Sequence, residues 1–201
     1  MVNIALKTYI LAFMTAHYPV ANHRFLGVTD EYTTARYEAI AADIADVSLD
    51  PDEPPVFRSG LITEKRARDL DGRVKTAVLL ASVARFESGG YREDVDTLVK
   101  KGDAGHAVCL LQLHVWAAEV VTDRPSCLRA GLRHIRESYR KCHDLSGYTV
   151  GHCVEHEAQA DKRSGMAAEW VKTHPFVMLP DVSDVSDVTA PSDLGAKLAP
   201  Q

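Results

Sequence analysis

The sequence lacks long hydrophobic runs and concentrations of positive charge. No segment reaches the ~18 consecutive apolar residues that a membrane-spanning helix needs, so we expect no transmembrane span. Acidic residues outnumber basic ones by 28 to 23, which gives a formal net charge of −5. Because no basic run interleaved with aromatic residues is present either, binding to nucleic acid through its phosphates is not expected.

Cysteine is also scarce, and all four cysteines fall between residues 109 and 153. Their even number allows two disulfides in three connectivities, or buried thiols, among Cys109, Cys127, Cys142 and Cys153. These cysteines lack the C-x₂₋₄-C pairing of common structural zinc sites. We therefore expect no bound metal.

Two other kinds of site remain as alternatives in the same stretch. The segment "KCHDLSGYTVGHCVEH" holds a cluster that would suggest zinc, made of Cys142, His143, His152, Cys153 and His156. A disulfide or a pair of core thiols explains its two cysteines more simply. A nucleophilic Cys109 or Cys153 would need an activated thiolate beside a histidine, and neither residue has a recognisable signature for that role.

The sequence does contain enough apolar residues to bury a core. It has 201 residues, of which 46% are hydrophobic and 25% charged, and this favours one domain with appendages. The first twenty residues do not resemble an export signal, because Lys7, Thr8 and Tyr9 interrupt their apolar run. A packed helix fits them better, with an apolar stripe formed by Ile4, Ile10, Leu11, Met14 and Tyr18.

Helical periodicity continues after this first segment. Thr29 and Asp30 are residue types that cap helices, and apolar residues then recur at helical spacing as far as Ile44. The following stretch, "SLDPDEPPVFRSG", contains three prolines and a glycine, which predicts a loop.

The segment "DGRVKTAVLLASVARFESGG" predicts a strong helix that is buried on most sides and ends at Gly89 and Gly90. Further helices are expected, at least in part, within the segments 106–121, 125–142 and 149–172. No series of strands is indicated, so the predicted fold class is all-α. Residues 179–201 carry Val-Ser-Asp repeats and no apolar stripe, which predicts a flexible acidic tail.

The stretch "RFESGGY" places Glu87 in the last turn of that buried helix. Burial and the negative end of the helix dipole both raise a carboxyl pKa, as a general acid working near neutral pH requires. Taken alone, a glutamate at a helix end is more often a solvated surface charge. Segments further along the chain favour the catalytic interpretation.

The segments "ESGG", "CLLQ", "CLRAGLRHIRES" and "YTVG" resemble, in order and spacing, the motifs of the lysozyme-like superfamily. The specific likeness is to soluble lytic transglycosylases and the related goose-type lysozymes, and it covers roughly residues 73–155. It implies a lysozyme-like, lytic transglycosylase-type helical domain over 70–178. Extra N-terminal helices over 1–69 would pack on that domain.

The resemblance implies a role for each matched residue. Glu87 stands at the catalytic glutamate, and Ser88 would either hydrogen-bond its carboxylate or cap the turn. Gln112 would offer its amide to an N-acetyl group or make a polar core contact. The Tyr148 hydroxyl would reach Glu87 or the sugar. Two further aromatic residues are expected to pack in the core rather than stack on sugar rings, namely Tyr91 and Trp116.

Some positions depart from the family pattern. Residues 106–109 replace a glycine-rich approach to the Leu-Gln pair, and Thr149 stands where asparagine is usual. His114 occupies the position of a second carboxylate that is common in the goose-type enzymes.

The implied activity is cleavage of the β-1,4 bond between N-acetylmuramic acid and N-acetylglucosamine in peptidoglycan, without a metal or organic cofactor. In lytic transglycosylases the glutamate acts as acid and then as base on the sugar's own 6-hydroxyl, which yields a 1,6-anhydro product. Asp103 matches the aspartate with which goose-type enzymes position water, so a hydrolase is the alternative. A structural or interaction protein that keeps the fold without turnover is another.

Such an activity acts on the cell wall, outside the cytoplasm, in the periplasm. Because the sequence shows no firm export signal, delivery within a phage virion or by a dedicated secretion system would reconcile the two observations. The expected partners are peptidoglycan glycan strands and, under this hypothesis, other proteins of the virion or secretion assembly.

Overall fold

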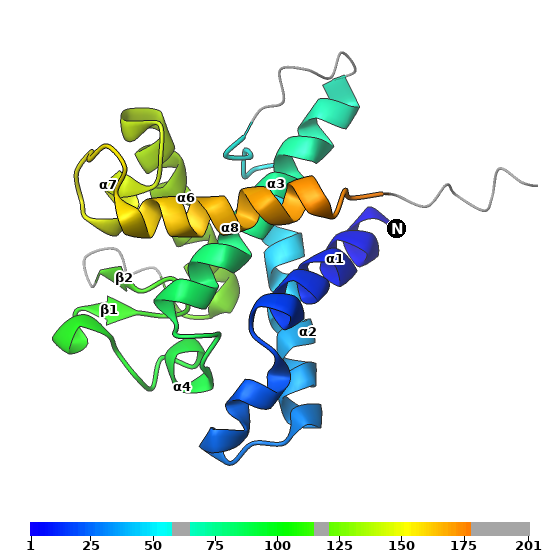
Figure 1. Cartoon of the computed structure of the whole chain (residues 1–201), viewed down its shortest axis with the longest axis vertical. Coiled ribbons are helices and arrows are strands. Elements are labelled where there is room, and N and C mark those ends of the chain that lie inside the picture. Colours follow the sequence, from blue (N-terminus) through cyan, green and yellow to red (C-terminus); the bar gives the residue numbers. More distant parts are fainter. Residues whose placement is uncertain (58–64, 115–120, 178–201) are drawn as a thin grey trace, which may run out of the picture.

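The computed structural model describes residues 1–57, 65–114 and 121–177 (Figure 1). The described chain is mostly helical and contains one two-stranded sheet, in agreement with the predicted helical class. None of its described helices is long and apolar enough to cross a membrane. Trp116 and the predicted tail over 179–201 lie outside the described residues.

Helix α1 (Val2–His17) packs its buried face, formed by Leu6, Ile10, Phe13 and Met14, against α2 (Asp30–Leu49) and α3 (Lys65–Glu87). The 3₁₀ helix η1 (Val20–Leu26) connects α1 to α2. The prediction that Ile4 belongs to the apolar stripe is wrong, since 71% of it is exposed. Ile4 precedes Leu6 by two residues, which is about 200° around a helix and therefore on its opposite side.

Helix α2 begins where the sequence predicts. The Thr29 hydroxyl accepts a hydrogen bond from the Tyr32 backbone N–H at 3.2 Å, which satisfies one of the free donors at the helix start. Tyr37, Ile40 and Ile44 are fully buried at helical spacing. This apolar face fixes how α2 lies against α1 and α3.

Helix α3 passes through the middle of the fold, in contact with α1, α2 and α8 (Ala158–Thr173) (Figure 1). Residues 76–84 are all buried, so the predicted burial on most sides is confirmed. The helix ends at Glu87, and Gly89 and Gly90 follow with φ of 64° and 93°. A side chain at residue 90 would collide with the Tyr18 ring, so the helix containing Glu87 ends against the N-terminal segment. The predicted boundary between the N-terminal helices (1–69) and the main domain (70–178) falls inside α3.

The start of the segment 106–121 forms a β-hairpin. Within 106–121 the sequence predicts a short helix or a turn, followed by a helix. The structure has strands β1 (Ala107–Val108) and β2 (Leu113–His114), which form an antiparallel hairpin that pairs Ala107 with His114, and residues 115–120 lie outside the described residues. The four residues between the strands include two with positive φ, Cys109 at 63° and Gln112 at 47°. The apolar run is buried because this turn inserts Leu110 and Leu111 into the core, not because it forms a helical stripe.

Helix α6 (Arg124–Cys142) confirms the predicted helix over 125–142. It begins with a capping box in which Asp123 and Ser126 bond each other's backbone N–H groups, and Pro125 lies in its first turn. The short helix α7 (Ser146–Thr149) follows, and then α8, whose N-cap is Glu157.

The short helix α4 (Glu93–Asp96) is held in place by an ion-pair network. The Asp96 side chain is only 2% exposed, and it accepts hydrogen bonds from Arg36 of α2 at 3.1 Å and from Arg124 of α6 at 2.7 Å. Arg124 also pairs with Asp43 at 2.7 Å. These contacts join α2, α4 and α6. The 3₁₀ helix η2 (Asp103–Gly105) is the next element along the chain after α4.

Candidate active site

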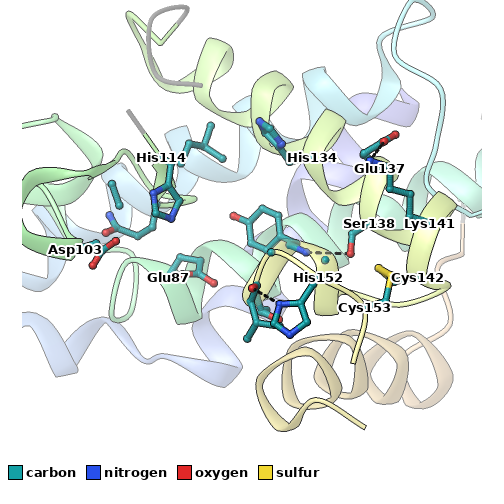
Figure 2. Close-up of a pocket in the computed structure, with 18 residues that line it drawn as sticks. Glu87, Asp103, His114, His134, Glu137, Ser138, Lys141, Cys142, His152 and Cys153 are labelled. Carbon is teal, nitrogen blue, oxygen red and sulfur yellow. Dashed lines mark hydrogen bonds and ion pairs between the residues drawn. A yellow bond between two sulfur atoms is a disulfide. The ribbon is translucent and has the colours of Figure 1, made fainter. Parts of the chain in front are cut away.

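A cavity of about 590 Å³ lies between the end of α3, the β1–β2 hairpin, α6 and α7 (Figure 2). Four of the residues that the sequence singled out line it: Glu87, Asp103, Gln112 and Tyr148. They come from α3, η2, the hairpin turn and α7, which are separate parts of the chain. We call this cavity, with the residues that line it, the groove.

Glu87 is the last residue of α3, and its side chain is 19% exposed. The Arg163 guanidinium donates a hydrogen bond from Nε to the carboxylate oxygen Oε1 at 3.0 Å, and its Nη2 forms an ion pair with the same oxygen at 2.8 Å. Burial raises the pKa of the Glu87 carboxyl, while the charge and hydrogen bonds of Arg163 lower it. The effect of burial is the larger, so the pKa lies above its usual range.

Arg163 is the residue at this site that sequence reasoning missed. It lies on α8, it is buried, and its Nη1 donates to the Gln159 backbone carbonyl at 2.8 Å. Its guanidinium carbon lies 5.3 Å from the centre of the Phe86 ring. No local pattern in the sequence marks Arg163, because its partner Glu87 lies 76 positions earlier in the chain.

Ser88 does not reach the groove. Its hydroxyl donates to the Ala84 carbonyl at 2.5 Å and accepts from the Tyr91 backbone N–H at 2.7 Å. Of the two roles left open for Ser88, the structure shows the capping of the turn after α3. Tyr91 is fully buried, as predicted, and its hydroxyl donates to the Ala81 carbonyl at 3.0 Å.

Gln112 and Asp103 lie next to each other in the fold. The Gln112 amide donates to the Cys109 carbonyl at 3.0 Å, and its Oε1 packs against Gly102, where an added Cβ would be only 1.7 Å away. Gly102 is therefore required for Gln112 to take this position beside the groove. Asp103, the next residue, is exposed and lies on the groove near Glu87 (Figure 2).

Tyr148 crosses from α7 to the hairpin. Its hydroxyl donates to the Leu111 carbonyl, and its backbone N–H donates to the Ser138 hydroxyl at 3.0 Å. Burial, and then the nearby charge of Glu87, raise the pKa of the Tyr148 phenol well above its usual range. The phenol therefore keeps its proton at neutral pH and remains a hydrogen-bond donor.

Thr149 stands where the lysozyme-like motif usually has asparagine, and its side chain contacts the start of α8. Its hydroxyl donates to Oε2 of Glu157 at 2.7 Å. Glu157 also accepts from the first backbone N–H groups of α8, at 2.9 Å from Gln159 and 2.7 Å from Ala160. Thr149 thus joins α7, which carries Tyr148, to the helix that carries Arg163.

Figure 2 shows that the other end of the groove is formed by Glu137, Ser138 and Lys141 of α6, beside the Cys142–Cys153 disulfide. Lys141 pairs with Glu137 at 2.8 Å. Hydrogen bonds from Arg140 and Lys141 lower the pKa of the Glu137 carboxyl to about 2. Glu137 is therefore ionised at neutral pH, in contrast to Glu87 with its raised pKa.

The four cysteines form two disulfides, Cys109–Cys127 and Cys142–Cys153. The first joins the hairpin turn to α6, and the second joins the end of α6 to the loop before α8. With both sulfurs of each pair bonded, the structure provides no thiolate for the zinc cluster or for a cysteine nucleophile. Within residues 1–57, 65–114 and 121–177, no group of three or more metal-ligating side chains is placed to hold an ion.

Comparison of the chain with protein-family models, with curated proteins and with solved structures finds no significant match.

Proposed function

We propose that this protein is a lysozyme-like, peptidoglycan-degrading lytic transglycosylase that cleaves the β-1,4 bond between N-acetylmuramic acid and N-acetylglucosamine. One observation supports this most. A single groove is lined by four residues that the motif pattern predicts as site residues, namely Glu87, Asp103, Gln112 and Tyr148. Among these residues Glu87 has the raised carboxyl pKa that a general acid needs.

The proposed reaction uses Glu87 twice. Its protonated carboxyl donates the proton to the glycosidic oxygen while the bond from that oxygen to C1 of N-acetylmuramic acid breaks. The resulting carboxylate then takes the proton from the 6-hydroxyl of the same sugar as that oxygen bonds to C1. This step closes a 1,6-anhydro ring and restores the protonated acid without water or a cofactor.

A hydrolase is the second candidate, because Asp103 is exposed on the same groove. An ionised aspartate there would position a water molecule to attack C1, and the product would carry a reducing end instead of a 1,6-anhydro ring. Asp103→Asn separates the two reactions, since it would remove hydrolysis and leave the intramolecular reaction intact.

The first prediction concerns the catalytic acid. When added to purified peptidoglycan, the wild-type protein is expected to clear turbidity and release muropeptides. Glu87→Gln is expected to release them at a rate at least ~100-fold lower, because a general acid typically raises the reaction rate by about that factor or more. Mass spectrometry of the released muropeptides shows whether their ends are 1,6-anhydro or reducing.

Glu137→Gln is the matched control, because Glu137 lines the same groove at the opposite end from Glu87. It should retain most of the activity. If wild-type protein releases no muropeptides at any pH from acid to neutral, the catalytic proposal is wrong, and a protein that uses the groove only for binding takes its place.

A protein with this activity would act in the periplasm, on the cell wall. We propose delivery as a virion component or through a dedicated secretion system, with the proteins of that assembly as partners. Detection of the chain in purified phage particles supports the virion route, and its absence there with recovery from the periplasm contradicts that route.

A further inference from the structure

The contact between Arg163 and Glu87 has an asymmetry that bears on the proposed chemistry. Two guanidinium nitrogens contact the same carboxylate oxygen, Oε1: Nε donates a hydrogen bond to it, and Nη2 forms an ion pair with it. Among the described residues, Oε2 of Glu87 has no hydrogen-bond partner. Since Glu87 lines the groove, Oε2 is the oxygen left for a substrate bound there.

The guanidinium that makes this contact is itself held from several directions. Nη1 donates to the Gln159 backbone carbonyl at 2.8 Å and to the Gln159 side-chain oxygen at 3.1 Å. The Phe86 ring packs near the guanidinium. The Ser82 hydroxyl of α3 donates to the Arg163 backbone carbonyl at 2.8 Å, which fixes α8 against the helix that carries Glu87. With only 10% of its side chain exposed, Arg163 has little freedom to move.

The hydrogen bond from Nε and the ion pair with Nη2 both disfavour a proton on Oε1. When Glu87 is protonated, its proton is therefore carried on Oε2. Charge-assisted hydrogen bonds to a guanidinium are also among the strongest that a carboxylate accepts, so they stabilise the carboxylate that proton transfer leaves behind. A carboxylic acid that is already held in the reactive orientation transfers its proton faster than one that must first be ordered into that orientation.

We propose that Arg163 is a positioning residue for Glu87, which holds Oε1 so that Oε2 is the oxygen that donates the proton and takes it back. This role rests on the proposed function, in which Glu87 is the acid and base. Arg163 itself does not touch the reacting atoms. Nothing in the motif pattern pointed to it, and the contact exists only because α8 packs on α3.

The test compares three variants in the muropeptide assay. Arg163→Met removes the charge and the hydrogen bond from Nε, and we expect kcat to fall by about 10- to 100-fold with KM little changed, as misplacement of a reacting group does. Because burial then acts on Glu87 without an opposing cation, the pKa of its carboxyl rises further. The pH above which activity is lost therefore moves upward.

Arg163→Lys keeps the positive charge but replaces the planar guanidinium, which contacts Oε1 through Nε and Nη2, with a single ammonium. It should keep the pH profile of wild type more closely than Arg163→Met does, while kcat still falls. Lys162→Met is the matched control, because Lys162 is the neighbouring cation and packs on the same Phe86 ring. It should leave kcat, KM and the pH profile unchanged.

A second readout separates this proposal from the proposed function. The Glu87 carboxyl can be titrated without substrate by carbon-13 NMR, with Glu87→Gln identifying its signal. In Arg163→Met this carboxyl should titrate at higher pH than in wild type, whether or not the protein cleaves peptidoglycan. If wild type is inactive but the titration shifts, the proposed function fails and the contact at Oε1 stands.

The role of Arg163 is overturned if Arg163→Met keeps the wild-type kcat and pH profile, or if the Glu87 titration does not move. Circular dichroism checks that each variant is folded. Should Arg163→Met not fold, Arg163→Lys decides the question, since unchanged kcat in that variant shows that the contact of the guanidinium with Oε1 has no positioning role.

Discussion

At the scale of single residues, the groove holds two carboxyl groups whose pKa values are shifted in opposite directions. Glu87 is largely buried, and burial raises its pKa despite the ion pair with Arg163. Glu137 is bonded by two cations on the surface of α6, and its pKa falls to about 2. A pair of carboxylates whose environments separate their pKa values in this way is typical of sites where one serves as an acid.

Gly131 of α6 provides a prediction about packing behind the groove. A Cβ at this position would lie 2.1 Å from Cδ1 and 3.2 Å from Cβ of Leu111, a fully buried residue whose carbonyl accepts the Tyr148 hydroxyl. Gly131→Ala is therefore expected to overpack the core and cost about 1–3 kcal/mol, less the ~1 kcal/mol that alanine contributes in a helix. Urea unfolding measures the change in the free energy of unfolding.

Gly165→Ala is the control for this prediction. Gly165 also lies within a helix, but a Cβ there meets no atom within 4 Å. We expect this variant to be as stable as wild type or more stable, by up to ~1 kcal/mol. A Gly131→Ala protein as stable as Gly165→Ala would contradict the packing described here.

At the scale of secondary-structure elements, long-range polar contacts place the groove walls. α8 reaches α3 through Arg163 and Ser82, and it reaches α7 through Glu157 and Thr149. α4 is held between α2 and α6 by the buried carboxylate of Asp96.

Asp96 gives the prediction at this scale. Asp96→Ala would leave Arg36 and Arg124 without their shared buried partner, and the loss of one side of a buried ion pair typically costs about 3–5 kcal/mol. Thermal or urea unfolding measures the loss. Glu169→Ala, which removes an exposed pair with Lys172 on α8, should change stability by less than ~1 kcal/mol. Equal effects of the two substitutions would show that the Asp96 network is not the contact that holds α4.

At the scale of the whole molecule, two disulfides and an aromatic cluster join distant parts of the chain. Cys109–Cys127 and Cys142–Cys153 connect both ends of α6 to the groove walls. On the other side of α3, His17 and Phe13 of α1 pack against Trp170 of α8. The N-terminal helices thereby contact the same helix that positions Glu87.

The half-buried His17 and the buried His23 make global stability dependent on pH. Burial, and then the charges of Arg85 and His174, lower the pKa of His17; burial, and then Arg36, lower that of His23. As pH falls through 6.5, the unfolded chain takes up protons at these residues before the folded chain does, so the free energy of unfolding decreases. Glu87, with its raised pKa, changes stability in the opposite direction as pH falls further towards 4.5.

We therefore expect a lower melting temperature at pH 5.5 than at pH 7, and a smaller difference in His17→Phe, which keeps an aromatic ring against Phe13 and Trp170. Scanning calorimetry at both values measures it. A wild-type protein whose melting temperature does not fall, or a His17→Phe variant with the full wild-type difference, contradicts this assignment.

The sequence alone determined what depends on near neighbours. The cap at Thr29, the buried centre of α3, the glycine-ended turn after Glu87 and the start of α6 all follow from residue types within a few positions of each other. The order of motifs also selected four residues that line the groove.

Only the tertiary structure decided the rest. Between a short helix and a turn, the sequence left the start of 106–121 open. The structure forms the β1–β2 hairpin there, because burial of Leu110 and Leu111 and the bond from Cys109 to Cys127 depend on residues outside the hairpin. The partner of Glu87 lies 76 positions away, and the partners of Asp96 lie 60 and 28 positions away. Periodicity reports which face of a segment is buried, but it carries no information about which distant charge will lie against it.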